Sequence, residues 1–244
     1  MTNAYIIFGA SSEIANAYLK EIAKHDPQAM VFCVSRSFID TSAVGIVVEQ
    51  FVCDYSKARL SELTNLLKER AIYPTQVVIF NGQLHYAQSM PEKKLDDIDE
   101  HYFNTLLNTN TLTPILCLQA IAPLLSHKIP CTITALSARV GSITDNNLGG
   151  WYSYRASKAA LNMLFKTAAI ELQRRAKQTR LILFHPGTTD TNLSKPFQKN
   201  VPAGKLFTPE FVASQLYTLL QQPEQLTEVG QPAYIDWQGE HIHW

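Results

Sequence analysis

The chain has 244 residues, a length that suits one large α/β domain or two small ones. Hydrophobic residues make up 46% of the sequence and charged residues 17%, so the chain can bury a large core and disorder is not expected. The 21 basic and 21 acidic side chains cancel, which argues against a nucleic-acid-binding protein, because such proteins usually carry a basic excess.

Segments with the patterns of strands and helices alternate along the chain. The expected strands are short apolar runs at residues 4–8, 30–34, 45–52, 76–80, 131–136, 180–184 and 233–235. Helical spacing of apolar side chains occurs at residues 14–22, 56–70, 95–107, 110–125, 152–175 and 208–221. The alternation predicts βαβ units around a parallel sheet of about seven strands. Because the strands are almost continuously apolar, helices should cover both faces, and we expect a doubly wound, Rossmann-like α/β fold.

No linker rich in Pro, Gly or Ser divides the sequence, so residues 1–244 are expected to form a single domain. Three polar stretches, residues 81–94, 141–150 and 187–207, follow predicted strands. They should lie over the carboxyl edge of the sheet, where such folds bind their ligands. The stretch 187–207 is the best candidate for a loop that closes over a substrate.

The cysteines lie far apart in the sequence, each in an apolar run, at Cys33, Cys53, Cys117 and Cys131. We therefore expect buried thiols, with neither a disulfide framework nor a metal site. The sequence has no apolar run of about 18 residues, and its first residues lack the basic segment of a signal peptide. A cytoplasmic protein without a membrane partner is the expectation.

The first predicted strand is followed by the turn Gly9-Ala-Ser-Ser-Glu-Ile-Ala. Gly9 permits a tight turn, and Ser11 and Ser12 can cap the following helix or bond a phosphate. The N–H groups and partial positive charge at such a helix start favour an anionic pyrophosphate. An ordinary capped turn is the alternative interpretation, because short glycine motifs often occur without a ligand.

The second predicted strand ends at Ser35 and Arg36. In dinucleotide-binding folds an acidic residue here contacts the ribose 2′-hydroxyl of NAD, whereas an arginine accommodates the 2′-phosphate of NADP. No carboxylate is present, and a guanidinium can bind phosphate through two parallel hydrogen bonds. The pattern favours NADP(H), with a solvated loop arginine as the alternative.

Tyr154 and Lys158 stand four residues apart near the start of a predicted helix, so they share one face of it. A phenol has a pKa near 10, and a nearby ammonium lowers that pKa. The pair could then transfer a proton to or from a carbonyl or hydroxyl oxygen. The same spacing also arises by chance, in which case the lysine would simply be solvated.

Further polar residues and glycines follow predicted strands in a fixed order. The full order is Gly9 with Ser11-Ser12, Asp54, Asn81-Gly82, Asn110, Ser137, Tyr154 with Lys158, and Pro186-Gly187 with Thr191. This order resembles the short-chain dehydrogenase/reductase family over about the first 195 residues. Residues 142–158 and the ending at 234–244 are similar to its C-factor-like branch.

The resemblance implies a role for each matching residue. Tyr154 would be the general acid in reduction, Lys158 would bind the nicotinamide ribose and acidify Tyr154, and Asn110 would hold a water in a proton relay. Ser137 completes the implied catalytic set. The implied cofactor is NADPH/NADP, whose own chemistry supplies the hydride. Its binding residues would be Gly9, Ser11, Ser12, Ile14, Ser35, Arg36, Asp54, Asn81, Gly82, Tyr154, Lys158, Pro186, Gly187 and Thr191.

Among these residues, Asp54 would contact adenine and Asn81 would support the central part of the cofactor. Pro186, Gly187 and Thr191 would line the nicotinamide. These roles come from the resemblance alone.

The chain departs from the family pattern at the phosphate turn. Glu13 and Ala15 stand where the family has its second and third glycines. The alanine is a mild change, but the side chain of Glu13 must turn away from a bound phosphate. Residues 80–83 also replace the family's usual Asn-Asn-Ala-Gly.

A second departure concerns the catalytic serine. When positions are counted from the fifth predicted strand, Ala138 stands where the family has its catalytic serine. Ser137 is adjacent, but adjacent strand residues face opposite sides, so a local bulge, or Ser142 from the next loop, would have to supply the hydroxyl. Without such a hydroxyl one polarising hydrogen bond is lost, and turnover should be slow.

Two functions are compatible with these residues. The leading hypothesis is an NADPH-dependent reductase that acts on the carbonyl of a small ketone, aldehyde or quinone, or catalyses the reverse alcohol oxidation. The alternative, by analogy with C-factor-like proteins, is a weakly catalytic or non-catalytic NADPH-binding protein that regulates or signals. Asn110, Tyr154 and Lys158 favour the enzyme, whereas Glu13 and Ala138 favour the alternative.

Two predicted helices, residues 110–125 and 152–171, are apolar over more than one face. In a monomer the surplus would face water unless loops or the C-terminal tail covered it. We expect a homodimer or homotetramer in which each helix pairs with its two-fold mate, an association that the resemblance also implies. If the side chain of Phe165 points outward, the substitution Phe165→Glu should dissociate the assembly and would test this expectation.

Overall fold

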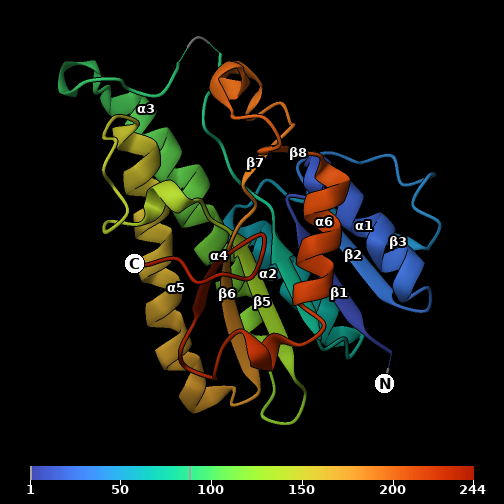
Figure 1. Cartoon of the computed structure of the whole chain (residues 1–244). Coiled ribbons are helices and arrows are strands. Elements are labelled where there is room, and N and C mark those ends of the chain that lie inside the picture. The colour runs from blue at the N-terminus through green and yellow to red at the C-terminus, as the bar shows by residue number, and fades with distance from the viewer. Residues whose placement is uncertain (1, 88) are drawn as a thin grey trace.

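The computed structural model describes residues 2–87 and 89–244, and a seven-stranded parallel sheet forms its centre (Figure 1). The strands are ordered β3-β2-β1-β4-β5-β6-β9. Their bounds are β1 Ala4–Phe8, β2 Met30–Ser35, β3 Val48–Val52, β4 Gln76–Ile79, β5 Cys131–Leu136, β6 Thr179–His185 and β9 Ala233–Asp236. The doubly wound α/β fold that the sequence predicts is confirmed.

The helices are α1 Glu13–His25, α2 Lys57–Glu69, α3 Glu100–Leu107, α4 Thr113–Ile121, α5 Tyr152–Arg175 and α6 Pro209–Leu219. Short 3-10 turns lie at Leu95–Asp97, Ala122–Leu124, Arg139–Gly141, Lys195–Asn200 and Pro223–Gln225, and a π-helical turn lies at Asn108–Leu112. Two short strands, β7 Thr188–Thr189 and β8 Leu206–Phe207, pair within the predicted substrate loop.

Two cores lie on opposite faces of the sheet, because successive residues of a strand point to opposite sides. Ile6 and Phe8 of β1 belong to the core beneath α2, α4 and α5. Tyr5 and Ile7 belong to the core beneath α1 and α6. Figure 1 shows α1 and α6 together on the face opposite α5. The alternation of Tyr5, Ile6, Ile7 and Phe8 therefore places helices on both faces, as predicted.

Element boundaries differ from the sequence prediction in two places. The predicted strand 45–52 begins only at Val48, because Gly45 has a φ of +86°, outside the extended region. The predicted helix 95–107 is interrupted before α3, because the carboxylate of Asp99 accepts a hydrogen bond from the N–H of Tyr102 at 2.7 Å and so caps a new helix start.

Neighbouring chain contacts both outer strands of the sheet. At the β9 edge, the N–H of Ile242 donates to the carbonyl of Tyr234 at 2.8 Å, so the last residues return antiparallel to β9. At β3, the side-chain amide of Gln50 bonds the backbone N–H and carbonyl of Ile39, at 2.8 and 2.9 Å. The contact at β9 therefore pairs backbone groups of the outer strand, whereas the contact at β3 is made by a side chain.

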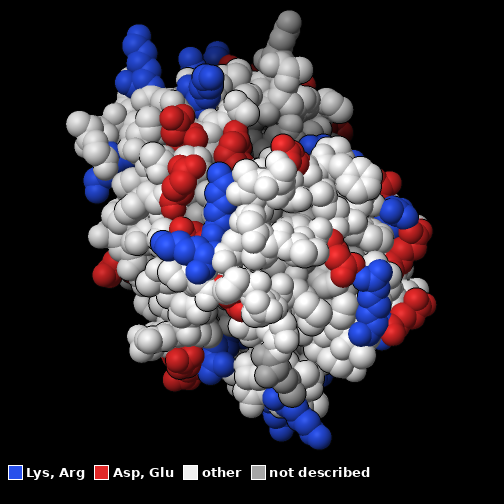
Figure 2. All heavy atoms as spheres, turned by 90° about the vertical axis from the view of Figure 1, so that its right-hand side faces the viewer, with Lys and Arg blue, Asp and Glu red and all other residues white. Residues whose placement is uncertain are grey.

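All four cysteines are buried free thiols, as the sequence predicts. Figure 2 shows basic and acidic side chains interspersed over the face that it displays, in keeping with the balanced charge of the chain. Among the residues that the structure describes, no helix is long and apolar enough to span a membrane.

Candidate active site

The strand order reverses between β1 and β4, so the loops after these strands diverge, and at such a point doubly wound folds form their ligand crevice, at the carboxyl edge of the sheet. Gly9, directly after β1, has a φ of +68°, and a Cβ at this position would lie 2.7 Å from the backbone nitrogen of Asn81. Only glycine fits this close approach of the two loops. The hydroxyl of Ser12 accepts a hydrogen bond from Ala15 N at 3.4 Å and caps α1.

Tyr55 connects the ends of β1 and β2 through its hydroxyl group, and the sequence analysis did not identify this role. Its hydroxyl accepts a hydrogen bond from Gly9 N at 2.9 Å and donates to the carbonyl of Val34 at 3.1 Å. Burial raises the pKa of Tyr55 to about 12, so the phenol keeps the proton that it donates. The only signal in the sequence is an aromatic residue that directly follows Asp54.

The predicted adenine end of the crevice is open to solvent. Arg36 is exposed just beyond β2, and Ser35 is buried with its hydroxyl donating to the carbonyl of Ser37 at 2.6 Å. Asp54 is also exposed, and its carboxylate accepts a hydrogen bond from Ser56 N at 2.8 Å. Hydrogen bonds from Ser56 lower the pKa of Asp54.

Two buried polar atoms in the crevice lack a protein partner in the described residues: the side-chain oxygens Oδ1 of Asn81 and Oγ1 of Thr189. Buried polar atoms of native proteins are almost always hydrogen-bonded, so such atoms fit a ligand that supplies donors. Asn81 follows β4, and Thr189 lies just after Pro186 and Gly187 at the end of β6. A polar ligand lying across the carboxyl ends of these strands would satisfy both.

Helix α5 carries Tyr154 and Lys158 one turn apart, and both side chains are buried. The Lys158 ammonium nitrogen donates to the carbonyl of Leu136 at 2.8 Å and lies 5.8 Å from the centroid of the Tyr154 ring. Burial lowers the pKa of Lys158 to about 7 and raises the pKa of Tyr154 above its usual value. The predicted lowering of the phenol pKa by Lys158 is therefore outweighed by burial in this arrangement.

Asn110 joins the loop after β4 to α5. It lies in the π-helical turn between α3 and α4, a local widening that is frequent at functional sites. Its side-chain oxygen accepts a hydrogen bond from Gln83 N at 2.7 Å, and its side-chain nitrogen donates to Gln83 O at 2.8 Å and to the hydroxyl of Ser157 at 3.1 Å. A Cβ on Gly82 would lie 3.8 Å from the side-chain oxygen of Asn110 and 3.7 Å from the ammonium nitrogen of Lys158. Asn110, Gly82 and Lys158 are thus brought together.

Ser137 is directed away from this group. Its hydroxyl donates to the side-chain oxygen of Asn162 at 2.7 Å within the core. Ala138 has extended backbone, with φ −152° and ψ 143°, so no bulge turns Ser137 toward Tyr154. The other candidate, Ser142, accepts a hydrogen bond from the backbone N–H of Asp145 at 3.0 Å.

Ala138 itself packs in the cluster that contains Tyr154, on the side where the family's serine was expected. The alternation of side chains along a strand explains both placements. Within the described residues, the hydroxyl of Ser137 bonds Asn162 and makes no hydrogen bond to Tyr154 or Lys158.

Glu13 points from the phosphate turn to the predicted substrate loop. Its carboxylate accepts a hydrogen bond from the backbone N–H of Asn192 at 3.0 Å. His85, from the loop after β4, also reaches this loop, with its ring nitrogen Nε2 3.2 Å from the carbonyl of Asn192. The start of α1 and the loop after β4 therefore both contact the segment 187–207 at Asn192.

An apolar and aromatic wall surrounds Tyr154. Its members come from the predicted loops 81–94 and 187–207, from α3, and from the residues on either side of the loop 141–150: Leu84, Tyr86, Tyr102, Leu106, Ala138, Val140, Trp151, Leu193 and Phe197. The ring centroid of Trp151 lies 6.1 Å from that of Tyr154 and 5.1 Å from that of Phe197. A wall of this composition suits an uncharged organic substrate.

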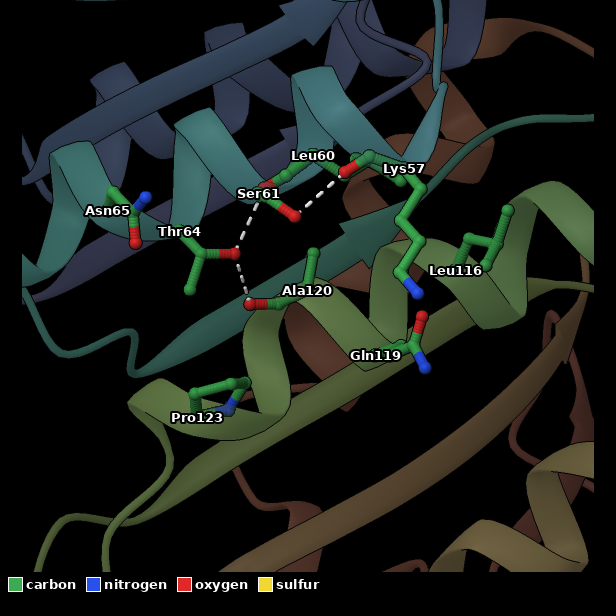
Figure 3. A pocket seen from close by; sticks show the side chains of 9 residues that line it. All are labelled: Lys57, Leu60, Ser61, Thr64, Asn65, Leu116, Gln119, Ala120 and Pro123. Atoms are coloured by element: carbon green, nitrogen blue, oxygen red, sulfur yellow. Dashed lines mark hydrogen bonds between the residues drawn. The ribbon is translucent and has the colours of Figure 1, made fainter.

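A separate hollow lies between α2 and α4, away from these residues (Figure 3). The hydroxyl of Thr64 in this hollow already bonds the carbonyls of Leu60 and Ala120, at 2.9 and 2.8 Å. Lys57 is the single charged residue of its lining. Residues 2–87 and 89–244 contain no cluster of three or more His, Cys, Asp or Glu side chains able to hold a metal ion.

A sequence model of the family described as short chain dehydrogenase matches residues 3–202. The 1-hydroxy-2-glutathionyl-2-methyl-3-butene dehydrogenase of Rhodococcus sp. (strain AD45) is 28% identical over 239 residues, which cover 98% of each chain. The C-signal of Myxococcus xanthus is 29% identical over 150 residues, covering 62% of this chain and 83% of that protein. Among solved structures, the NADPH-bound carbonyl reductase from chicken fatty liver has a TM-score of 0.76 at 19% identity, covering 100% of this chain and 99% of the other.

Proposed function

Because the chain belongs to the short-chain dehydrogenase family of oxidoreductases, we propose that it is an NADP(H)-dependent enzyme acting on a carbonyl group. The substrate would be a small ketone, aldehyde or quinone, or the corresponding alcohol in the reverse direction. The observation that carries this proposal is the buried pair of Tyr154 and Lys158, set beside Gly82 and beneath an uncharged aromatic wall. The carbonyl reductase from chicken fatty liver shares the fold and supports the same chemistry.

The residues of the crevice fit a nicotinamide dinucleotide. Gly9, Ser11, Ser12 and Ile14 would hold its pyrophosphate at the start of α1, where N–H groups and the helix dipole favour anions. The side-chain oxygen of Asn81, which has no hydrogen-bond partner in the described residues, would accept a hydrogen bond from the central part of the dinucleotide. When bound, the nicotinamide supplies the hydride.

The remaining cofactor contacts are proposed from the same placement. Ser35 and Arg36 would hold the 2′-phosphate, and Asp54 would contact adenine. Pro186, Gly187 and Thr191, beside the orphaned hydroxyl of Thr189, would line the nicotinamide.

The catalytic residues would act on the proton. Tyr154 would donate its phenolic proton to the substrate oxygen, and the ammonium of Lys158, one helical turn away, would stabilise the phenolate left behind. Asn110 would fix the loop at Gln83 and connect the pair to a water relay. Ser137 has no role in this mechanism, because its hydroxyl is used by Asn162.

Arg36→Ala should weaken NADPH binding about ten- to a hundredfold while leaving NADH binding nearly unchanged. A charge-assisted hydrogen bond contributes about 1.5–3 kcal/mol, and the exposed Arg36 would make such bonds only to a 2′-phosphate. Fluorescence titration with both dinucleotides measures the effect, and Arg59→Ala, on α2, is the matched control. Equal losses for both cofactors would exclude a contact between Arg36 and the 2′-phosphate.

A second candidate function is a weakly catalytic NADPH-binding protein that regulates or signals. The observation that favours it is Ala138, which packs beside Tyr154 and leaves that position without a hydroxyl. The C-signal of Myxococcus xanthus is among the relatives, which makes this candidate worth testing.

Ala138→Ser distinguishes the two candidates. If the missing hydroxyl limits turnover, the variant should reduce carbonyl substrates about tenfold faster, because it restores one polarising hydrogen bond of about 1–1.5 kcal/mol. Steady-state oxidation of NADPH with a panel of ketones, aldehydes and quinones measures this. No gain in the variant, from a slow wild type, would favour the regulatory candidate.

We propose further that the protein forms a homodimer or homotetramer through α4 and α5. The exposed side of these helices carries Met163, Leu164 and Ile170, and Leu112 in the preceding π-helical turn. Phe165 is not part of this side, because it is fully buried in the core. The condition for placing a charge at Phe165, an outward-pointing side chain, is therefore not met, and the charge belongs at Met163, which is 64% exposed.

Light scattering should give a multiple of 27.4 kDa for the wild type at micromolar concentration. Met163→Glu should reduce the mass toward that of one chain, because it places a charge in an apolar interface. Met30→Glu, at an exposed methionine outside α4 and α5, is the control and should leave the mass unchanged. A wild-type mass near 27.4 kDa would contradict the assembly.

We also propose that the chain forms a single cytoplasmic domain with small-molecule partners. Both cores share one sheet, which supports a single domain. Reduced, buried cysteines suit a reducing compartment, because such thiols persist there.

A further inference from the structure

Glu92 is a buried carboxyl group in the loop after β4, and it contacts a helix that begins far along the chain. Its residue is 2% exposed. Both carboxylate oxygens lie 3.2 Å from the backbone nitrogen of Ser153, in the first turn of α5, and the hydroxyl of Ser153 also donates to this group. Within the described chain, no ion pair includes Glu92. Its charge is thus stabilised by donors at the positive end of the helix dipole.

The residues before α5 form a turn that the helix does not cap by itself. Gly149, Gly150 and Trp151 have φ values of +64°, +64° and +54°. Trp151 is the N-cap, and its side chain makes no capping hydrogen bond. Left-handed backbone is unfavourable for a residue with a Cβ and persists only where surrounding contacts hold it.

Contacts from two sides hold this turn. The carbonyl of Glu92 accepts a hydrogen bond from the N–H of Trp151 at 2.6 Å. On the other side, the guanidinium of Arg155 donates to the carbonyls of Gly150 and Gly149, at 2.9 and 3.0 Å. A Cβ on Gly150 would lie 3.4 Å from the carbonyl oxygen of Glu92, so the two segments are in close contact.

The turn determines where the Trp151 indole lies. In its left-handed conformation, Trp151 places its ring between Tyr154, at 6.1 Å and edge-on, and Phe197 of the substrate loop, at 5.1 Å. If the φ of Trp151 were negative, its side chain would point in another direction. The wall beside the proton-donating phenol then depends on the contacts of Glu92.

We propose that Glu92 is a positioning residue: its carboxylate caps α5 at Ser153 and so anchors the Glu92 segment, whose backbone carbonyl bonds Trp151 and holds the left-handed turn that places the indole against Tyr154. Glu92 does not touch the reacting atoms and acts through Trp151 and the start of the helix. The consequence for turnover rests on the oxidoreductase function proposed above, whereas the position of the indole does not.

The first test needs no activity. In a Trp237→Phe, Trp244→Phe background, Trp151 is the only tryptophan, and acrylamide quenching reports the exposure of its indole. Glu92→Ala should raise the quenching constant at least twofold. Glu92→Gln keeps an acceptor oxygen at the same reach and should restore the wild-type value. Thr208→Ala, which removes the side-chain cap of α6, is the matched control and should leave the constant unchanged.

The second test compares kinetics with cofactor binding. Glu92→Ala should lower kcat about tenfold or more while the Kd for NADPH stays within twofold, because the crevice at Gly9 is untouched. Glu92→Gln should recover most of the rate. If Glu92→Ala does not fold, Glu92→Asp, which keeps the charge but is one methylene shorter, should show the same losses in part.

The outcomes separate the two proposals. Unchanged quenching in Glu92→Ala overturns the role of Glu92, whatever the activity of the wild type. Increased quenching with an unchanged kcat would show that Glu92 only caps the helix. That result would also overturn its role as a positioning residue. A wild type that turns over no carbonyl substrate contradicts the proposed function instead, and the quenching result alone then decides the role of Glu92.

Discussion

Tyr154→Phe should reduce turnover by about 10²–10⁴-fold without unfolding the protein or preventing NADPH binding. The change removes only the transferable proton, and a general acid contributes about that factor. Among the described residues, no hydrogen bond involves the hydroxyl of Tyr154, so its loss leaves no protein group unsatisfied. The ring stays packed in its apolar cluster. The thermal midpoint should therefore shift little.

The measurement combines kcat, the NADPH Kd and the thermal midpoint of the variant. Tyr152→Phe is the matched control, because Tyr152 lies two residues earlier on the same helix with 38% of its surface exposed. Its kcat should equal that of the wild type. Undiminished turnover in Tyr154→Phe would remove this phenol from the mechanism, and equal losses in both variants would point to disturbance of α5.

Lys158→Met should abolish turnover yet make the free protein more stable at neutral pH. Burial lowers the pKa of Lys158 to about 7, well below the value near 10.4 of an unfolded chain. Between these values the unfolded state binds more protons, so the stability of the wild type rises with pH across this window. Below about pH 7 both states are protonated, and the folded state bears the full cost of the buried charge. A methionine of similar length avoids that cost, with an expected gain of about 1–4 kcal/mol at pH 6.

Urea unfolding of both proteins at pH 6 and pH 10 measures this effect. The difference between them should shrink strongly at pH 10, where Lys158 is neutral in the folded state and no longer places a buried charge there. The lost hydrogen bond to Leu136 O offsets part of the gain. Lys20→Met, at an exposed position on α1, should show no comparable difference. A variant less stable than the wild type at pH 6 would contradict the cost of the buried lysine.

The sequence predicts the fold well because its signals are local. Alternating apolar runs mark β1, β4, β5 and β6, and these strands start within one residue of their predicted bounds. Gly45 was misassigned because its apolar neighbours extend the run, whereas its left-handed backbone ends it. The direction of Phe165 is not predictable from the sequence, because apolar residues lie on more than one face of α5 and the pattern does not show which face meets the core.

The candidate site is predictable only in part, because some of its contacts join distant segments. Tyr154 and Lys158 are one helical turn apart, so their spacing shows that they meet. Glu92 caps a helix 61 positions away and Glu13 reaches a loop 179 positions away, and no spacing rule relates such pairs. Ser137 illustrates a different limit: adjacency in the sequence suggested a substitute for the serine missing at position 138, but strand geometry turns its hydroxyl to the opposite face.

The paired edge at β9 has a consequence for how copies of this chain could meet. An open β-edge offers unpaired N–H and carbonyl groups on which a foreign strand can grow, and this is a common start of aggregation. Here the return of the last residues pairs the carbonyl of Tyr234 with Ile242 and the N–H of Asp236 with Glu240, so these groups are not available to a foreign strand. The assembly that we propose through α4 and α5 would instead use side-chain contacts between helices, which can form a closed, finite assembly, whereas backbone pairing has no natural end.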